Sequence, residues 1–146
     1  MMPQGTVRDA VKAALFENRF IRGLSQREAD KAVAWANGEL ESKRLLVVGE
    51  TGSGKSMLVT TLWPLFKNPC NLCMISGRWP EWAQPMILDG SNLGLGDRRE
   101  DQRIKNAIAQ WPDDKQLLVT AYDEWVGLVK GWTVVRLGTP SADHQR

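Results

Sequence analysis

The residues from Gly49 to Ser56 fit the spacing G-x-x-x-x-G-K-[ST], which is suited to binding phosphate. Glycines at 49, 52 and 54 allow the backbone to turn tightly through φ angles that a Cβ would oppose, and successive N–H groups then form an anion-binding nest. Lys55 is expected to reach the β- and γ-phosphates of a nucleotide, and the Ser56 hydroxyl is expected to bind Mg²⁺. This segment, the 49–56 loop, therefore predicts a site for a nucleoside triphosphate.

The segments on either side of the 49–56 loop support this prediction. Residues 45–48 are apolar and predict a short buried strand, and residues 57–63 predict the start of a helix. The N-terminus of that helix adds free N–H groups and the positive end of its dipole. The alternative, a glycine-rich turn that binds nothing, is disfavoured because strand, turn and helix follow one another. The residues expected to contact the nucleotide are Gly49, Glu50, Thr51, Gly52, Ser53, Gly54, Lys55, Ser56 and Met57.

Two carboxylates follow a second apolar run, residues 116–122. Asp123 is expected to hold Mg²⁺ through water, and Glu124 is expected to polarise the water that attacks the γ-phosphate. An ordinary strand with an acidic turn is the alternative, and Thr120 and Tyr122 make the run less apolar than usual. With the 49–56 loop upstream, we favour the catalytic interpretation.

Two helices are predicted before the first strand. The first spans about residues 6–22 and ends at Gly23, and the second begins at the capping box Ser25–Glu28 and runs to about Gly38. We favour a brace on the sheet over an appendage that binds a partner, because each helix has an apolar face. These faces consist of Val7, Ala10, Val11, Ala14, Leu15 and Asn18 in the first helix and Ala29, Ala32, Val33 and Ala36 in the second.

The rest of the chain alternates strands and helices, which favours parallel pairing of the strands. The helix after the 49–56 loop is expected at 56–66, with a kink or stop at Pro64. The other expected segments are a short strand at 72–75, a strand at 86–89, a loop at 90–96, a helix at 97–110 and a strand at 133–137.

Length and charge set further limits. The 146 residues suggest one domain, and 19 basic against 17 acidic side chains do not indicate a strongly basic nucleic-acid binder, although a local basic loop would suffice. No apolar run approaches the 18 or so residues of a membrane span, and no signal peptide is evident. Two cysteines without a signal fit a reducing cytoplasm.

Cys70 and Cys73 form a C-x-x-C pair, which is weakly informative alone. A closed zinc site needs four ligands, and the only further soft candidate is His144. We favour Cys73 as a small core residue over a metal or redox role. The nearby loop at 77–85 carries Trp79 and Trp82, whose rings are expected to cap the core, with adenine stacking or a partner surface as alternatives.

The 49–56 loop together with Asp123 and Glu124 resembles the P-loop NTPases of the additional-strand group, which includes the RecA-like and AAA+ ATPases. Within that group, residues 45–56 are similar to the loop of DNA-pumping motors of the FtsK/HerA type and of the coupling and secretion ATPases of conjugation. The resemblance covers about 30 residues at two sites. It implies ATP as the nucleotide, DNA as a partner, and a homo-oligomer or partner protein that supplies an arginine.

The same resemblance implies a polar residue that senses the γ-phosphate at the end of a later strand. Thr139 is the first candidate and Ser141 the second, and a plain strand-to-turn junction is equally compatible with these residues. Arg136 lies within the strand and is a poor candidate for an arginine finger in cis.

Other P-loop classes fit the sequence less well. The acidic motif differs from the Asp-Glu-Ala-His of DEAH helicases, and no Asn-Lys-x-Asp run for guanine occurs. A small-molecule kinase has the right size, and residues 97–103 offer arginines for its lid, although the three interleaved acids favour a solvated helix face.

The sequence thus predicts an α/β, three-layer P-loop domain over 43–146 with a mainly parallel sheet, preceded by a two-helix extension over 1–42, the core being either minimal or truncated. The predicted function is Mg²⁺-dependent binding and hydrolysis of ATP, coupled to work on a macromolecule such as DNA, in the cytoplasm. A small-molecule phosphotransferase and a nucleotide-dependent adaptor that grips a partner through the loop at 79–82 are the alternatives.

Overall fold

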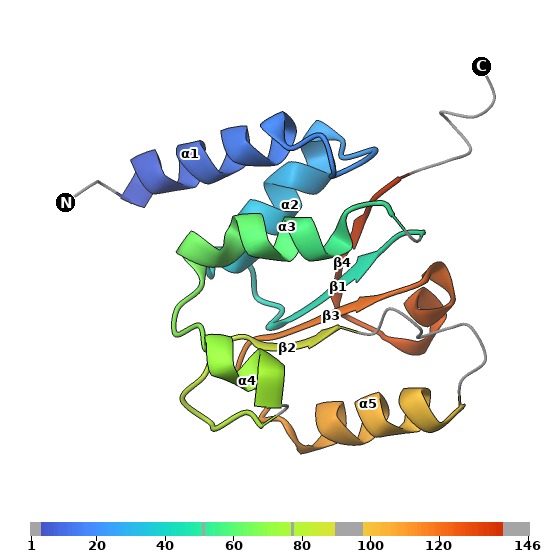
Figure 1. The fold of residues 1–146 in the computed structure, drawn as a ribbon. Helices are drawn as coiled ribbons and strands as arrows, with labels where there is room; N and C mark the ends of the chain where they lie inside the picture. The colour runs from blue at the N-terminus through green and yellow to red at the C-terminus, as the bar shows by residue number, and fades with distance from the viewer. Residues whose placement is uncertain (1–3, 51, 77, 90–97, 139–146) are drawn as a thin grey trace.

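A four-stranded, all-parallel sheet forms the centre of the protein (Figure 1). The computed structural model describes residues 4–50, 52–76, 78–89 and 98–138. The spatial order of the strands is β2-β3-β1-β4. Their bounds are Arg44–Val48 for β1, Met86–Asp89 for β2, Leu117–Ala121 for β3 and Thr133–Arg136 for β4.

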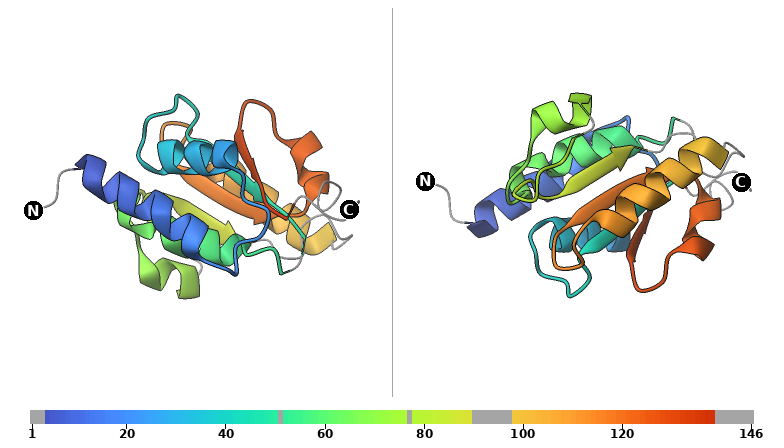
Figure 2. Two further views of the ribbon diagram at one scale, coloured as in Figure 1. Left: turned by 90° about the horizontal axis from the view of Figure 1, so that it is seen from above. Right: turned by 90° about the horizontal axis from the view of Figure 1, so that it is seen from below.

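Helices cover both faces of this sheet. Helices α1, α2 and α3 lie on one face and α5 lies on the other, as the views from above and from below show (Figure 2). The structure therefore confirms a mixed α/β fold with parallel strands and helices on both faces. The helices are α1 (Gln4–Glu17), α2 (Gln26–Ala36), α3 (Lys55–Leu62), α4 (Asn71–Ser76) and α5 (Arg98–Gln110), with 3-10 turns η1 (Trp63–Leu65) and η2 (Asp123–Leu128).

Strand β1 shows why the apolar runs of this sequence form strands. Leu45 and Val47 pack with the helices α1 to α3, whereas Leu46 and Val48 pack with Ile104 of α5. Successive side chains of a strand point to opposite faces, so a strand covered on both faces must be apolar at every position. All four of these β1 residues are fully buried.

The N-terminal helices brace the sheet, as the sequence predicts. Val11 and Leu15 of α1 and Ala29 and Val33 of α2 are buried in the same core cluster as Leu45. The prediction for the end of the first helix was wrong, because α1 ends at Glu17 and not near residue 22. The side chain of Asn18 accepts a hydrogen bond from the backbone N–H of Phe20 (2.9 Å), a local bond that competes with helix continuation.

The capping box at the start of α2 forms only in part. Ser25 Oγ accepts from the Glu28 N–H (3.1 Å), which confirms the N-cap. The Glu28 carboxylate does not return to Ser25. It accepts from the backbone N–H of Arg136 (2.9 Å) and pairs with Lys31 (3.1 Å), which ties α2 to β4.

The segment after the 49–56 loop differs from prediction at one point. Helix α3 ends at Leu62 and passes into the 3-10 turn that contains Pro64, as expected for a proline at this place. The strand predicted at 72–75 is instead the helix α4. Leu72 is 75% exposed while Cys73 is buried, so this apolar run is not an interior strand.

The described ranges hold no helix with the length and apolar character needed to cross a membrane.

An ion pair joins α1 to the chain beyond α2 and predicts a pH effect. Arg8 donates two hydrogen bonds to Glu39 (2.9 and 2.8 Å) and Asn37 donates a third, which together lower the pKa of Glu39 to about 2 from its usual 4.5. The carboxylate therefore stabilises the fold above its unfolded pKa, and that contribution is lost as the pH falls from about 4.5 toward 2. The pair is solvent-exposed, which limits the effect to about 1 kcal/mol.

Urea unfolding at neutral and acidic pH tests this prediction with Glu39→Gln as the comparison. The wild type should lose up to about 1 kcal/mol more stability than the variant between neutral pH and the lower limit of this window. Equal losses in both proteins would show that the pair contributes nothing to the acid sensitivity of the fold.

Candidate functional site

The glycines of the 49–56 loop serve two different purposes. Gly52 (φ 82°) and Gly54 (φ 97°) adopt the left-handed conformation that the sequence predicts. Gly49 has no positive φ, so that part of the prediction was wrong. A Cβ at Gly49 would instead lie 2.5 Å from Ser53 Oγ and 3.2 Å from the carbonyl oxygen of Leu137. Gly49 is therefore needed for close packing within the loop and against the chain after β4.

The chain between α1 and α2 packs directly against the 49–56 loop. A Cβ at Gly54 would overlap the carbonyl oxygen of Phe20 and lie 2.7 Å from the Cα of Ile21. The Arg22 N–H donates to the Ser53 carbonyl (2.8 Å). The loop is thus held from outside by residues that the sequence analysis placed at the end of a helix, and no local pattern indicated this contact.

The Lys55 ammonium lies inside the 49–56 loop. The residue is 9% exposed, and its Nζ donates to the carbonyl oxygens of Gly49 and, at 3.4 Å, Glu50. The same nitrogen lies 4.5 Å from the ring centroid of Tyr122. Ser56, the second residue of α3, is exposed. A cation and a hydroxyl therefore stand at the point where the free N–H groups of the α3 N-terminus also lie.

Strand β3 brings the predicted carboxylates to the same edge of the sheet. It pairs directly with β1, with Val48 opposite Ala121, so Asp123 follows the end of β3 just as the loop follows the end of β1. Asp123 and Glu124 begin the 3-10 turn η2 and are exposed. Ligands of open α/β sheets bind outside the carboxyl ends of the strands, which is where these groups meet.

Arg136 takes part in this site, which the sequence analysis did not foresee. Its Nη1 donates to Asp123 Oδ1 at 3.2 Å, and its Cα lies opposite Val48 in the pairing of β4 with β1. The side chain is about half exposed. Arg136 therefore ends beside the carboxylate expected to hold Mg²⁺, although it lies within a strand.

Strand β2 adds a further acidic residue to this edge, one the sequence analysis treated only as the end of a strand. Asp89 is the last residue of β2, and its Cα pairs with that of Thr120. An apolar run that ends in Asp could have indicated it. Three residues of the predicted site, Thr51, Thr139 and Ser141, lie outside the described residues.

The donor atoms of this edge suit Mg²⁺. Within the part of the chain that the structure describes, no three His, Cys, Asp or Glu side chains form a metal cluster. A nucleotide-bound Mg²⁺ needs no such cluster, because it takes one or two protein oxygens, phosphate oxygens and waters. The Ser56 hydroxyl and the Asp123 carboxylate are hard oxygen ligands of that kind. The space beside Gly49 and Gly54 is taken up by Ser53 and Phe20, so these two glycines serve the packing of the loop.

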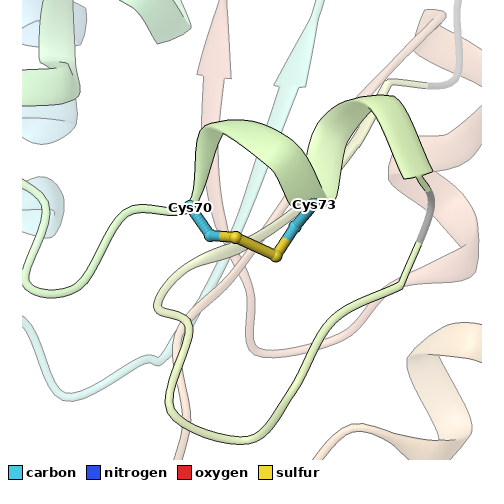
Figure 3. Close-up of a disulfide and its surroundings, with 2 residues drawn as sticks. All are labelled: Cys70 and Cys73. Atoms are coloured by element: carbon cyan, nitrogen blue, oxygen red, sulfur yellow. A yellow bond between two sulfur atoms is a disulfide. The ribbon is translucent and has the colours of Figure 1, made fainter.

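Cys70 and Cys73 form a disulfide at the start of α4 (Figure 3). Their Cα atoms are 5.4 Å apart, as residues three apart on a helix are. Cys73 is buried, which confirms the predicted core position, and both sulfurs are joined to each other and not to a metal. A reducing compartment favours free thiols, so the predicted cytoplasmic location does not account for this disulfide. The location itself stays a prediction.

The loop that carries Trp79 and Trp82 lies at the opposite edge of the sheet from the 49–56 loop. It precedes β2, so it stands near the amino ends of the parallel strands, whereas the 49–56 loop follows a carboxyl end. Trp79 packs against the core and Trp82 is 57% exposed. This placement confirms the core contact predicted for Trp79, whereas the same prediction was wrong for Trp82. It disfavours stacking of either ring on a nucleotide at the 49–56 loop.

The function of this edge rests on its own residues and their geometry. Lys55 and Ser56 begin α3, shortly after β1, and Asp123 follows β3, the neighbour of β1 in the sheet. Comparison of the chain with known proteins finds no matching family model, no similar curated protein and no similar solved structure.

Proposed function

We propose that the protein binds ATP with Mg²⁺ at the 49–56 loop and hydrolyses it. The observation that carries the proposal is the Lys55 ammonium, held inside a glycine loop between β1 and α3 and beside Tyr122. A nearly buried lysine is costly unless it has oxygen partners, and here those partners are backbone carbonyls of the loop itself. Phosphate oxygens, which carry charge, are better acceptors for the same ammonium.

The residues of the site divide the work of hydrolysis between them. Lys55 exchanges loop carbonyls for phosphate oxygens, and the backbone N–H groups of the loop bind the remaining phosphate oxygens. Ser56 and Asp123 would hold Mg²⁺, which neutralises charge on the β- and γ-phosphates. Glu124 accepts a proton from the attacking water. Its position in η2, exposed at the carboxyl edge of the sheet, leaves room for that water.

Arg136 donates a hydrogen bond to Asp123. If Asp123 holds Mg²⁺, the guanidinium would be available to stabilise negative charge on the phosphates. The coupling of hydrolysis to DNA, and an oligomer in which a neighbour supplies a further arginine, are supported only by the resemblance of the two motifs.

The strand order supports two assignments for the metal-binding acid. If Asp123 is that acid, its strand β3 lies directly beside β1, with no strand between them. The additional strand of the resembled group is then missing between β1 and the strand that carries the acid. In that case a small-molecule phosphotransferase becomes a second candidate function. If Asp89 is that acid, β3 is the additional strand between β2 and β1. Asp123→Asn and Asp89→Asn distinguish the two, because the variant that loses the Mg²⁺ dependence of nucleotide binding identifies the ligand.

Release of phosphate from ATP tests the proposal, measured with and without DNA for the wild type and Lys55→Ala. We expect Mg²⁺-dependent release by the wild type and its loss in Lys55→Ala, because the lysine is the cation that the phosphates need. Binding of ATP without any release would contradict hydrolysis. Transfer of phosphate to an added acceptor, and not to water, would establish the phosphotransferase.

A further inference from the structure

A pocket lies on the α5 face of the sheet, beside the turn η2. It has a volume of about 370 Å³. Its walls come from four places in the sequence: the start of β1, the middle of α5, the turn η2 and the approach to β4. The side chains used below are Arg44, Lys105, Trp125, Leu128, Lys130 and Trp132. The sequence analysis did not connect them, because they come together only in the folded chain.

The pocket has an aromatic wall. Trp132 is half-buried, and the Arg44 guanidinium carbon lies over its ring, 5.9 Å from the centroid. Trp125, which is 1% exposed, also lines the pocket. Leu128, 56% exposed, adds apolar surface at the rim.

Positive charge surrounds this wall. Lys105 and Lys130 are exposed, and neither forms an ion pair within the described ranges. Arg44 pairs with Asp113 at 3.1 Å, but that carboxylate is fully exposed and therefore screens the arginine only weakly. A chain with a net charge of only +2 thus gathers three cations around one pocket.

We propose that this pocket binds a nucleotide of single-stranded nucleic acid, with a base against Trp132 and the flanking phosphates on Lys105 and Lys130. Aromatic rings beside a cationic groove are the general means of binding single strands, because every base has a face that can stack. A double strand keeps its bases stacked on each other and cannot use such a ring. This inference rests on the proposed function only for its DNA partner and not for ATP hydrolysis.

The position of the pocket links it to the candidate catalytic residues. Trp125 follows Glu124 directly, and one short turn, η2, carries Glu124 at its start and Leu128 at its end. A base seated against the pocket therefore contacts the turn that positions the proposed water-activating carboxylate. If the proposed function holds, we expect single-stranded DNA to stimulate ATP hydrolysis through this turn; binding of the strand itself does not depend on hydrolysis.

Fluorescence anisotropy of a labelled oligothymidylate of about 15 nucleotides tests the site, with the full chain and no ATP. Trp132→Ala should weaken binding about tenfold or more, from the loss of base stacking, and Trp132→Phe should retain most of it. Lys105→Glu with Lys130→Glu should weaken binding and reduce the slope of log K against log[salt] by about 1.4, which is about 0.7 for each lost phosphate contact.

Matched controls lie away from the pocket. Trp82→Ala removes an exposed tryptophan ring outside the pocket, and Lys67→Glu reverses the charge of another exposed lysine, so both variants should bind as the wild type does. Lys55→Ala should also keep its DNA affinity. Absence of ATP hydrolysis in the wild type, with DNA binding retained, would count against the proposed function and leave this site standing.

Three results would overturn the inference. The first is no binding of the single strand at low salt, and the second is equal binding by the wild type, Trp132→Ala and the double lysine variant. The third is a duplex bound more tightly than the single strand, because the base would then be unable to reach Trp132.

Discussion

Replacing Gly54 with alanine should destabilise the protein by about 2 to 5 kcal/mol. The residue has φ 97°, which costs an L-amino acid about 1 to 2 kcal/mol. A Cβ there would also overlap the carbonyl oxygen of Phe20, and relief of such an overlap by backbone movement costs about 1 to 3 kcal/mol more. Neither the added Cβ nor the carbonyl oxygen of Phe20 moves with a side-chain rotamer, so only a shift of the backbone can remove the overlap.

Gly52→Ala is the matched control for this prediction. Gly52 has a similar φ of 82°, but nothing lies within 4 Å of a Cβ at that position. Its loss should be limited to the conformational cost of about 1 to 2 kcal/mol. Urea unfolding of both variants measures the difference. Equal losses would show that the segment from Phe20 to Arg22 does not hold the 49–56 loop as described.

Replacing Glu124 with glutamine should lower the rate of ATP hydrolysis about 10²- to 10⁴-fold. The amide keeps the size of the side chain but cannot accept a proton from water. The affinity for MgATP should stay close to that of the wild type, because Lys55, Ser56 and the loop N–H groups make the ground-state contacts. Single-turnover phosphate release, measured beside equilibrium binding, separates the two effects.

Glu41→Gln provides the control for Glu124→Gln, since Glu41 is an exposed glutamate outside the site, and it should hydrolyse ATP at the wild-type rate. A wild-type rate in Glu124→Gln would remove Glu124 as the base. Such a result, accompanied by phosphate transfer to a small acceptor, would favour the phosphotransferase.

The strands and the loop were predictable because their causes are local. Residues 45–48 are apolar at every position and residues 117–121 at every position but Thr120, as strands covered on both faces must be. The glycine spacing of the 49–56 loop specifies the turn in the same local way, and Gly52 and Gly54 adopt the expected conformation. Parallel pairing followed from the alternation of strands and helices.

The features that escaped prediction depend on contacts between distant residues or on competition between local preferences. The run at 72–75 is short and apolar, so its pattern fits a strand or a helix equally well. Phe20 against Gly54, and Arg136 against Asp123, join elements that no sequence pattern connects. The cationic pocket is of the same kind, since Lys105 and Trp132 come from separate elements.

The stabilising partners of Lys55 show how the site and the fold depend on each other. Its ammonium donates a hydrogen bond to the Gly49 carbonyl of the loop, and in the proposed function the same ammonium moves to phosphate. Substitution of Lys55 therefore affects both the stability of the loop and the binding of phosphate. For this reason the unfolding of a Lys55 variant has to be measured beside its ligand binding.

Calorimetric titration of MgATP into the wild type and Lys55→Ala tests the central claim most directly. We predict saturable binding at one site in the wild type, weakened at least about tenfold in Lys55→Ala, because a charged hydrogen bond to phosphate is lost. A Lys55→Ala variant that remains folded and binds MgATP as tightly as the wild type would contradict the assignment of the 49–56 loop as the phosphate site.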